Sequence, residues 1–74
     1  MAYEDKFIVA VGLFSKTLTR KREAIRTLHR ALRKGGVGSH GSVVQKEPDG
    51  QTTLIYQAEF NYRQGRPALI VHEL

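Results

Sequence analysis

Residues 18–36 read LTRKREAIRTLHRALRKGG and contain the helical pattern on which the fold of this 74-residue chain depends. Ile25, Leu28 and Leu32 recur at positions i, i+3 and i+7. This spacing places apolar side chains on one face of a helix and polar side chains on the other. The pattern therefore predicts a single amphipathic helix over residues 18–34.

Both ends of the predicted helix carry recognisable signals. Gly35 and Gly36 follow the last apolar residue, and glycine readily adopts the left-handed conformation that ends a helix. At the other end, Leu18 extends the apolar stripe by one heptad. Hydroxyl side chains can cap the first turn by accepting hydrogen bonds from its backbone N–H groups. The candidate N-caps are Ser15, Thr17 and Thr19.

The segment before the helix, residues 7–14, reads FIVAVGLF and predicts a β-strand. β-Branched and aromatic residues favour strands, and the segment has no helical period. Both of its alternating sets of side chains are apolar, and a strand of this kind is normally covered on both faces. The helix supplies one cover, and we expect a partner chain to supply the other.

Three further strands are expected after the helix. Residues 42–47 predict a short strand with Val43 and Val44 as its apolar part, and residues 68–73 predict the last strand. Residues 51–63 alternate apolar and polar side chains at period two. Residues 48–50 (PDG) and 64–67 (QGRP) are turn sequences. Because both turns are short, the three strands are expected to form an antiparallel meander with the last strand at an edge.

The predicted fold class is therefore α+β, in the order β-α-β-β-β, with one amphipathic helix packed on a small, mainly antiparallel sheet. The helix is expected to pack on the sheet face that carries Leu54, Tyr56 and Phe60. The length is that of a single domain, residues 1–74. A chain of this size buries only about 60% of its unfolded surface. With no cysteine for a disulfide, we expect stabilisation by association into a homodimer.

Composition argues against several classes of protein. Cysteine ligands for zinc are absent, and the three histidines do not have metal-ligand spacing. The sequence shows no nucleophile–base arrangement, no paired carboxylates and no cofactor fingerprint, so we expect no metal, no cofactor and no enzymatic activity. No apolar run approaches the roughly 20 residues that span a membrane, and the N-terminal residues lack the basic start of a signal peptide. The expected location is the cytoplasm, without membrane association.

Positive charge is concentrated in the predicted helix. The formal net charge of the chain is +5 at pH 7. Residues 16–34 contain eight lysines or arginines and one acid, a net charge of +7, whereas the rest of the chain has a net charge of −2. Such asymmetry predicts a partner that is polyanionic or acidic.

The spacing of the basic residues favours nucleic acid, DNA or RNA, as that partner. Arg22, Arg26, Arg30 and Lys34 recur every four residues and form one ridge, with Glu23 as the one interleaved acid. Neighbours on the ridge rise about 6 Å along the helix, a spacing with which it could follow a nucleic-acid backbone. We therefore expect a small protein that binds nucleic acid or regulates a nucleic-acid process. The predicted phosphate-binding residues are Arg20, Arg22, Arg26, Arg30, Arg33 and Lys34.

Two alternative interpretations of the basic helix remain open. The partner could be an acidic protein surface, with the chain acting as a phage or mobile-element type of interaction module that docks on a host enzyme and inhibits or redirects it. The ridge could also be a solvated face whose long side chains cover the edge of the core. A protein complex that survives nuclease treatment would favour the interaction module.

His40 is the one residue with a catalytic appearance. It lies in residues 35–41 (GGVGSHG), which predict a flexible loop after the helix. Gly-Ser-His at 38–40, followed by a strand, the PDG turn and another strand, resembles the HicA-type mRNA-interferase toxins over residues 38–53. The resemblance implies a double-stranded-RNA-binding-like fold and RNA cleavage by His40. That family is expected to begin and end with helices, whereas this chain is predicted to begin and end with strands. Because of this difference, a small ribonuclease toxin ranks as the third alternative.

Overall fold

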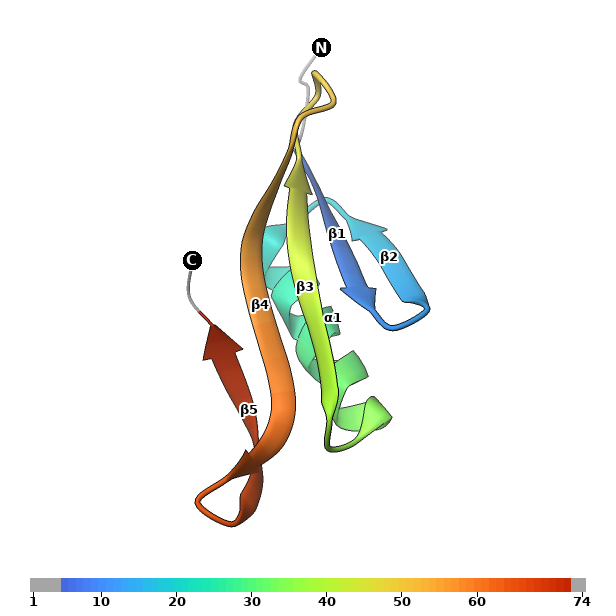
Figure 1. The fold of residues 1–74 in the computed structure, drawn as a ribbon. Coiled ribbons are helices and arrows are strands. Elements are labelled where there is room, and N and C mark those ends of the chain that lie inside the picture. The colour runs from blue at the N-terminus through green and yellow to red at the C-terminus, as the bar shows by residue number, and fades with distance from the viewer. Residues whose placement is uncertain (1–4, 73–74) are drawn as a thin grey trace.

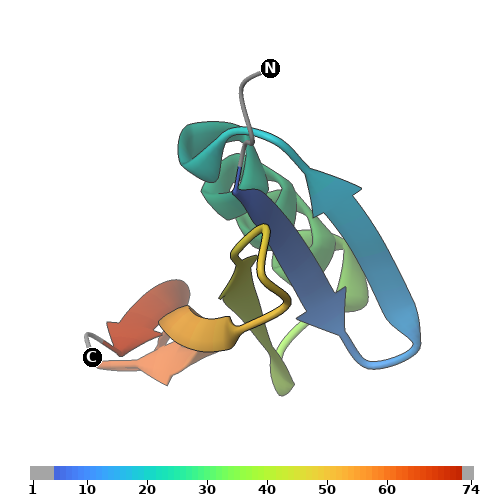
Figure 2. The same ribbon diagram turned by 90° about the horizontal axis from the view of Figure 1, so that it is seen from above.

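The computed structural model describes residues 5–72, which form one helix and one five-stranded sheet. The elements are β1 (Lys6–Val11), β2 (Phe14–Leu18), α1 (Lys21–Gly35), β3 (Ser39–Lys46), β4 (Thr52–Arg63) and β5 (Arg66–His72). The strand order is β2-β1-β3-β4-β5, and every neighbouring pair is antiparallel. Helix α1 lies against one face of the sheet (Figure 1; Figure 2). The α+β class and the meander β3-β4-β5 are confirmed.

The first segment is a hairpin, and not the single strand predicted over residues 7–14. Gly12 has a φ of 57°, a left-handed conformation that glycine adopts without steric cost. The chain reverses at this point, and Phe14 at the start of β2 pairs with Val11 at the end of β1. The observed order of elements is therefore β-β-α-β-β-β. The apolar sequence runs through the turn without a polar break, which is why the turn is hidden in it.

Helix α1 begins three residues later than predicted. Its N-cap is Arg20, which has an extended backbone and makes no side-chain capping hydrogen bond. Ser15 and Thr17 lie in β2, and Thr19 precedes the cap, so none of the three predicted N-caps has that role. Leu18 also lies in β2, yet it packs against the same core from the sheet. Its place in the apolar pattern therefore reflects burial, and not a further turn of helix.

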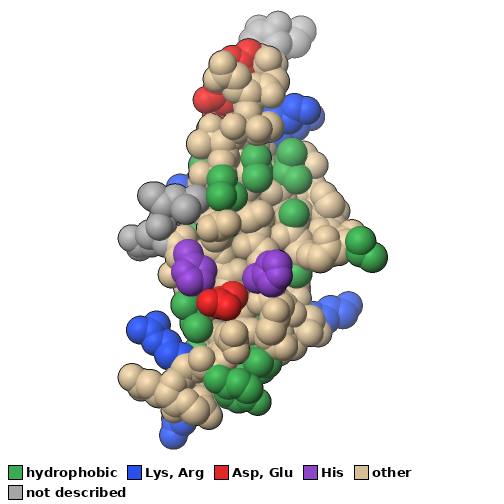
Figure 3. Space-filling view, in the orientation of Figure 1, with side chains coloured by type: hydrophobic (Ala, Val, Ile, Leu, Met, Phe, Trp, Pro, Cys, Tyr) green, Lys and Arg blue, Asp and Glu red, His purple; other side chains and the backbone are tan. Residues whose placement is uncertain are grey.

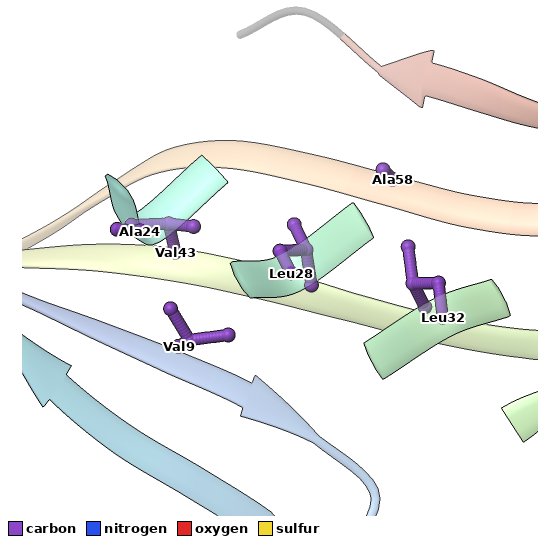
Figure 4. Packing of buried hydrophobic residues seen from close by; sticks show 6 residues of the cluster. All are labelled: Val9, Ala24, Leu28, Leu32, Val43 and Ala58. Atoms are coloured by element: carbon purple, nitrogen blue, oxygen red, sulfur yellow. The ribbon is translucent and has the colours of Figure 1, made fainter. Parts of the chain in front are cut away.

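The core lies between α1 and the sheet (Figure 4). Leu28 and Leu32 of the predicted stripe are fully buried, whereas Ile25 is half-buried and Ala24 is buried beside them. Burial of a leucine side chain contributes about 1.5–3 kcal/mol, so these two leucines are the main anchors of the helix. The six buried core residues are Val9, Ala24, Leu28, Leu32, Val43 and Ala58.

Gly41 allows α1 to come close to the sheet. A Cβ atom at this position would lie 2.6 Å from the carbonyl oxygen of Ala10 and 2.7 Å from Cδ1 of Leu28. The loop is also shorter than the predicted residues 35–41, because α1 extends to Gly35 and because Ser39, His40 and Gly41 already belong to β3. Close packing of helix on strand is the reason for glycine at this position, and not flexibility.

A β-bulge changes which face of the sheet the start of β4 presents. Val43 pairs with Tyr56 and Val44 pairs with Leu54, so Ile55 is the additional residue. Cross-strand partners share a face. Tyr56 therefore lies on the helix-covered face with buried Val43, whereas Leu54 lies on the open face and is 40% exposed. The prediction that Leu54 packs under the helix is wrong, and Ile55 packs against the core instead.

The face of the sheet opposite α1 is not covered by any described element. Ile8 of β1 pairs with Val44 of β3 there, and both side chains are half-buried. Figure 3 shows hydrophobic side chains grouped on this face and lysine and arginine side chains near its margins. The cover expected from a partner chain remains a prediction. Within residues 5–72, no helix has the length and apolar character needed to cross a membrane.

Candidate functional site

The basic residues of the helix segment all lie on the surface of the molecule. The core-facing residues of α1 are Ala24, Leu28 and Leu32, and the cations are offset from this stripe. They therefore face away from the sheet or toward its edges. All six residues predicted to bind phosphate are exposed: Arg20, Arg22, Arg26, Arg30, Arg33 and Lys34.

Carboxylates neutralise little of this charge in the part of the chain that is described. Nη1 of Arg20 lies 4.0 Å from Oε1 of Glu23, and both side chains are largely exposed, so this ion pair is weak. Among residues 5–72, the other five predicted cations form no ion pair with a carboxylate. Arg33 and Lys34 lie in the last turn of α1, where cations also interact favourably with the helix dipole. The dipole accounts for these two positions, but not for the arginines of the preceding turns.

Four residues on the outer side of α1 line a shallow hollow of about 330 Å³: Arg26, His29, Arg30 and Arg33. Nε2 of His29 lies 2.7 Å from the hydroxyl oxygen of Tyr56, which ties the imidazole to β4. Burial, together with the positive charge of Arg33, lowers the pKa of His29, and burial raises the pKa of Tyr56. His29 is therefore neutral at pH 7, and the positive charge of the hollow comes from three guanidinium groups.

A larger hollow of about 520 Å³ lies between the first hairpin and α1. Phe14 and Lys16 line it from β2, and Arg30 and Lys34 line it from the helix. Arg30 lines both hollows, so the cationic surface continues from the outer side of α1 to the β2 edge of the sheet. The contribution of Phe14 and Lys16 is not visible in the sequence, because it depends on a hairpin for which Gly12 is the only local signal.

A third hollow, of about 450 Å³, lies on the open face of the sheet and brings His40, Glu59 and His72 together. His40 pairs with Glu59 across β3 and β4, and Nε2 of His72 lies 3.1 Å from Oε1 of Glu59. In Figure 3, two histidine side chains flank an acidic one on this face. The strand register thus gives His40 a neighbouring carboxylate and a second histidine, although the three residues are far apart in the sequence.

These surfaces define the class of protein as a small α+β domain with a cationic helix on one side of its sheet and a polar hollow with two histidines on the other. Residues 5–72 contain no cluster of three or more His, Cys, Asp or Glu side chains arranged to hold a metal ion. No protein-family model, curated protein or solved structure matches the chain.

Proposed function

We propose that this chain binds nucleic acid through phosphate contacts made by α1, as a nucleic-acid-binding or nucleic-acid-process regulatory protein. The supporting observation is the row of exposed cations without carboxylate partners within residues 5–72. Like charges four residues apart on a helix cost about 0.2–0.5 kcal/mol per pair. Glutamates between the arginines would remove this cost, and only Glu23 is present among them. The simplest reason for the row of arginines is a bound polyanion that neutralises it.

The chemistry of the side chains fits phosphate. Arginine presents a planar fork of N–H donors that binds two phosphate oxygens at once. Arg22, Arg26 and Arg30 rise about 6 Å from one to the next along α1, so neighbouring side chains can contact successive phosphates. Binding of this kind releases counterions and distinguishes poorly between base sequences. The proposal therefore concerns affinity for the backbone, with DNA and RNA both as possible partners.

The salt dependence of binding tests the proposal. Replacing Arg26 and Arg30 with glutamine removes two cations that would bind phosphate, while the side chains stay polar and helix-compatible. On duplex DNA, the slope of log K against log salt concentration should decrease by about 0.9 for each phosphate that is no longer neutralised. Fluorescence anisotropy with a labelled oligonucleotide, repeated at several salt concentrations, measures this slope.

A matched control comes from Arg63 and Arg66, which are exposed at the β4–β5 turn and lie outside α1. Replacing both with glutamine makes the same change in net charge and should alter the slope much less. Equal effects of the two double variants would contradict a specific role for α1. Binding that is insensitive to ionic strength would exclude the proposal. A protein complex that persists after nuclease treatment would favour the acidic-partner alternative.

One observation favours a second function, ribonuclease activity with His40. One imidazole can take the proton of a ribose 2′-hydroxyl as that oxygen attacks phosphorus, and another can protonate the departing 5′-oxygen. The hollow on the open face contains two imidazoles, His40 and His72, and Glu59 accepts a hydrogen bond from Nε2 of His72. This arrangement lies on the opposite side of the sheet from α1. RNA cleavage can therefore be tested separately from nucleic-acid binding by α1.

Substitution of His40 distinguishes this second function from binding alone. His40→Ala should abolish cleavage of a labelled RNA and leave its affinity unchanged. His29→Gln is the matched control, because His29 is outside the hollow on the open face, and this variant should cleave normally. Absence of cleavage by the purified wild-type protein, or full cleavage by His40→Ala, would exclude the ribonuclease.

A further inference from the structure

The groove between the first hairpin and α1 exists because the helix does not fill the space above the edge strand. The side chains of α1 that line it on the sheet side are small, namely Thr27 and Ala31, with Gly35 at the end. Larger residues, Leu28 and Leu32, point instead to the centre of the sheet and are fully buried. The result is an open volume of about 520 Å³ bounded by β2 on one wall and α1 on the other.

Strand pairing determines which side chains of β2 reach this groove. Lys16 pairs with Val9, whose side chain is fully buried under α1, and Phe14 pairs with Val11, which also lines the groove. Cross-strand partners share a face. Lys16 and Phe14 are therefore on the helix side of the sheet, and Phe14 is 44% exposed.

The groove combines an aromatic ring with three cations. Lys16 lies on the β2 wall, and Arg30 and Lys34 lie on the helix wall. None of the described residues that line the groove is acidic. Its volume lies within the roughly 300–1,000 Å³ that is usual for small-ligand sites. A suitable occupant therefore carries negative charge next to a flat apolar surface, and a nucleotide has both.

We propose that this groove binds one unpaired nucleotide of a single-stranded nucleic acid, with the base against Phe14 and the phosphates held by Lys16, Arg30 and Lys34. The inference rests on the proposed function and adds to it a preference among nucleic acids. A duplex offers phosphates to α1, but its bases are stacked on one another and present no free face to Phe14. A single strand satisfies both surfaces, because Arg30 links the groove to the outer hollow of α1.

Comparison of single-stranded and duplex probes tests this inference directly. The probes are labelled oligonucleotides of about 12 nucleotides, within the usual site size of single-strand-binding folds, alone and annealed to their complements. Wild-type protein should bind the single strand more tightly at equal salt concentration. Phe14→Leu keeps an apolar side chain but removes the ring, and should weaken single-strand binding about ten-fold while leaving duplex binding unchanged.

The matched control is Tyr62→Leu, which removes another exposed aromatic ring at a site that does not line the groove. This variant should bind both probes as the wild type does. Circular dichroism of each variant verifies that the fold is retained. The chain contains no tryptophan, so the indole of a Phe14→Trp variant can be excited selectively at wavelengths that the three tyrosines do not absorb, and a stacked base should quench it.

The outcomes separate this inference from the function on which it rests. Salt-dependent binding with equal affinity for both probes, no effect of Phe14→Leu and no quenching in Phe14→Trp would overturn the groove inference and leave phosphate binding by α1 intact. Absence of binding to either probe would contradict the proposed function itself. Quenching in Phe14→Trp by an acidic peptide, with none by the oligonucleotide, would assign the groove to a protein partner.

Discussion

Gly41 lies where Leu28 of α1 packs directly on the sheet. A methyl group there would overlap the carbonyl oxygen of Ala10 and the side chain of Leu28, both held in place by the sheet and the core. Gly41→Ala should therefore lower the free energy of unfolding by about 1–3 kcal/mol, the usual cost of overpacking. Urea denaturation measures this decrease. Ser42→Ala, one residue along on the open face, is the control and should change stability by less than about 0.5 kcal/mol.

We expect His29 to make the stability of the fold depend on pH. Burial and Arg33 lower its pKa below the ordinary value of about 6.5, so the unfolded chain binds a proton more readily than the folded one. The stabilisation from neutral His29 is present above the unfolded-state pKa, and it decreases as pH falls through about 6.5 toward the lower folded-state pKa. We expect NMR titration to give a pKa below 6.5 for His29.

Substitution of the histidine isolates this contribution. His29→Gln keeps a polar group next to Tyr56 but does not titrate, so its stability should fall less than that of the wild type between pH 7 and pH 5. Urea denaturation at the two pH values provides the comparison. Identical pH dependence of the two proteins would show that His29 does not titrate differently on folding.

At the scale of the helix, the row of arginines should reduce stability when no ligand is bound. Arg26 has like-charged neighbours four residues away on both sides, Arg22 and Arg30. Arg26→Glu turns these two repulsive pairs into attractive ones, whereas its pair with Glu23, three residues away, becomes repulsive. The net change should raise the free energy of unfolding by up to about 1 kcal/mol. The same variant should bind nucleic acid more weakly, because one phosphate contact becomes repulsive.

Thermal or urea denaturation, measured beside oligonucleotide affinity, tests this opposition between stability and binding. Arg66→Glu, outside the helix, is the control of equal charge change for the affinity measurement. Lower stability of Arg26→Glu would indicate that the arginine has a structural role. An unchanged affinity of this variant for the oligonucleotide would show that Arg26 does not contact nucleic acid.

The elements differ in how much of them local sequence determines. The meander after the helix was predictable because PDG and QGRP join apolar segments through short turns, and β3, β4 and β5 are observed there. The first hairpin was not predictable, because its turn at Gly12 and Leu13 lies inside an apolar run that no polar residue interrupts. The sequence of β2, FSKTL, is largely polar, so only its pairing with β1 in the folded sheet shows that a second strand is present.

At the scale of the whole molecule, the open sheet face bears on the predicted homodimer. Ile8, Val44 and Leu54 lie on this face without a cover from the described chain. We expect light scattering to give twice the 8.4 kDa chain mass. Val44→Glu, which places a charge in the centre of this face, should give the monomer, whereas Gln51→Glu in the exposed β3–β4 turn should not. A monomeric wild-type protein would contradict the prediction.

The sequence by itself determined the α+β class, the amphipathic helix and the concentration of positive charge on it. These properties depend on periodicity, turn residues and charge among residues close together in the chain. Tertiary structure alone decided the β-bulge that turns Leu54 to the open face, and the sites built from distant residues: Phe14 and Lys16 beside Arg30 and Lys34, and His40 beside Glu59 and His72. Strand register and helix placement set these contacts, and both result from packing of the whole chain, so no local pattern encodes them.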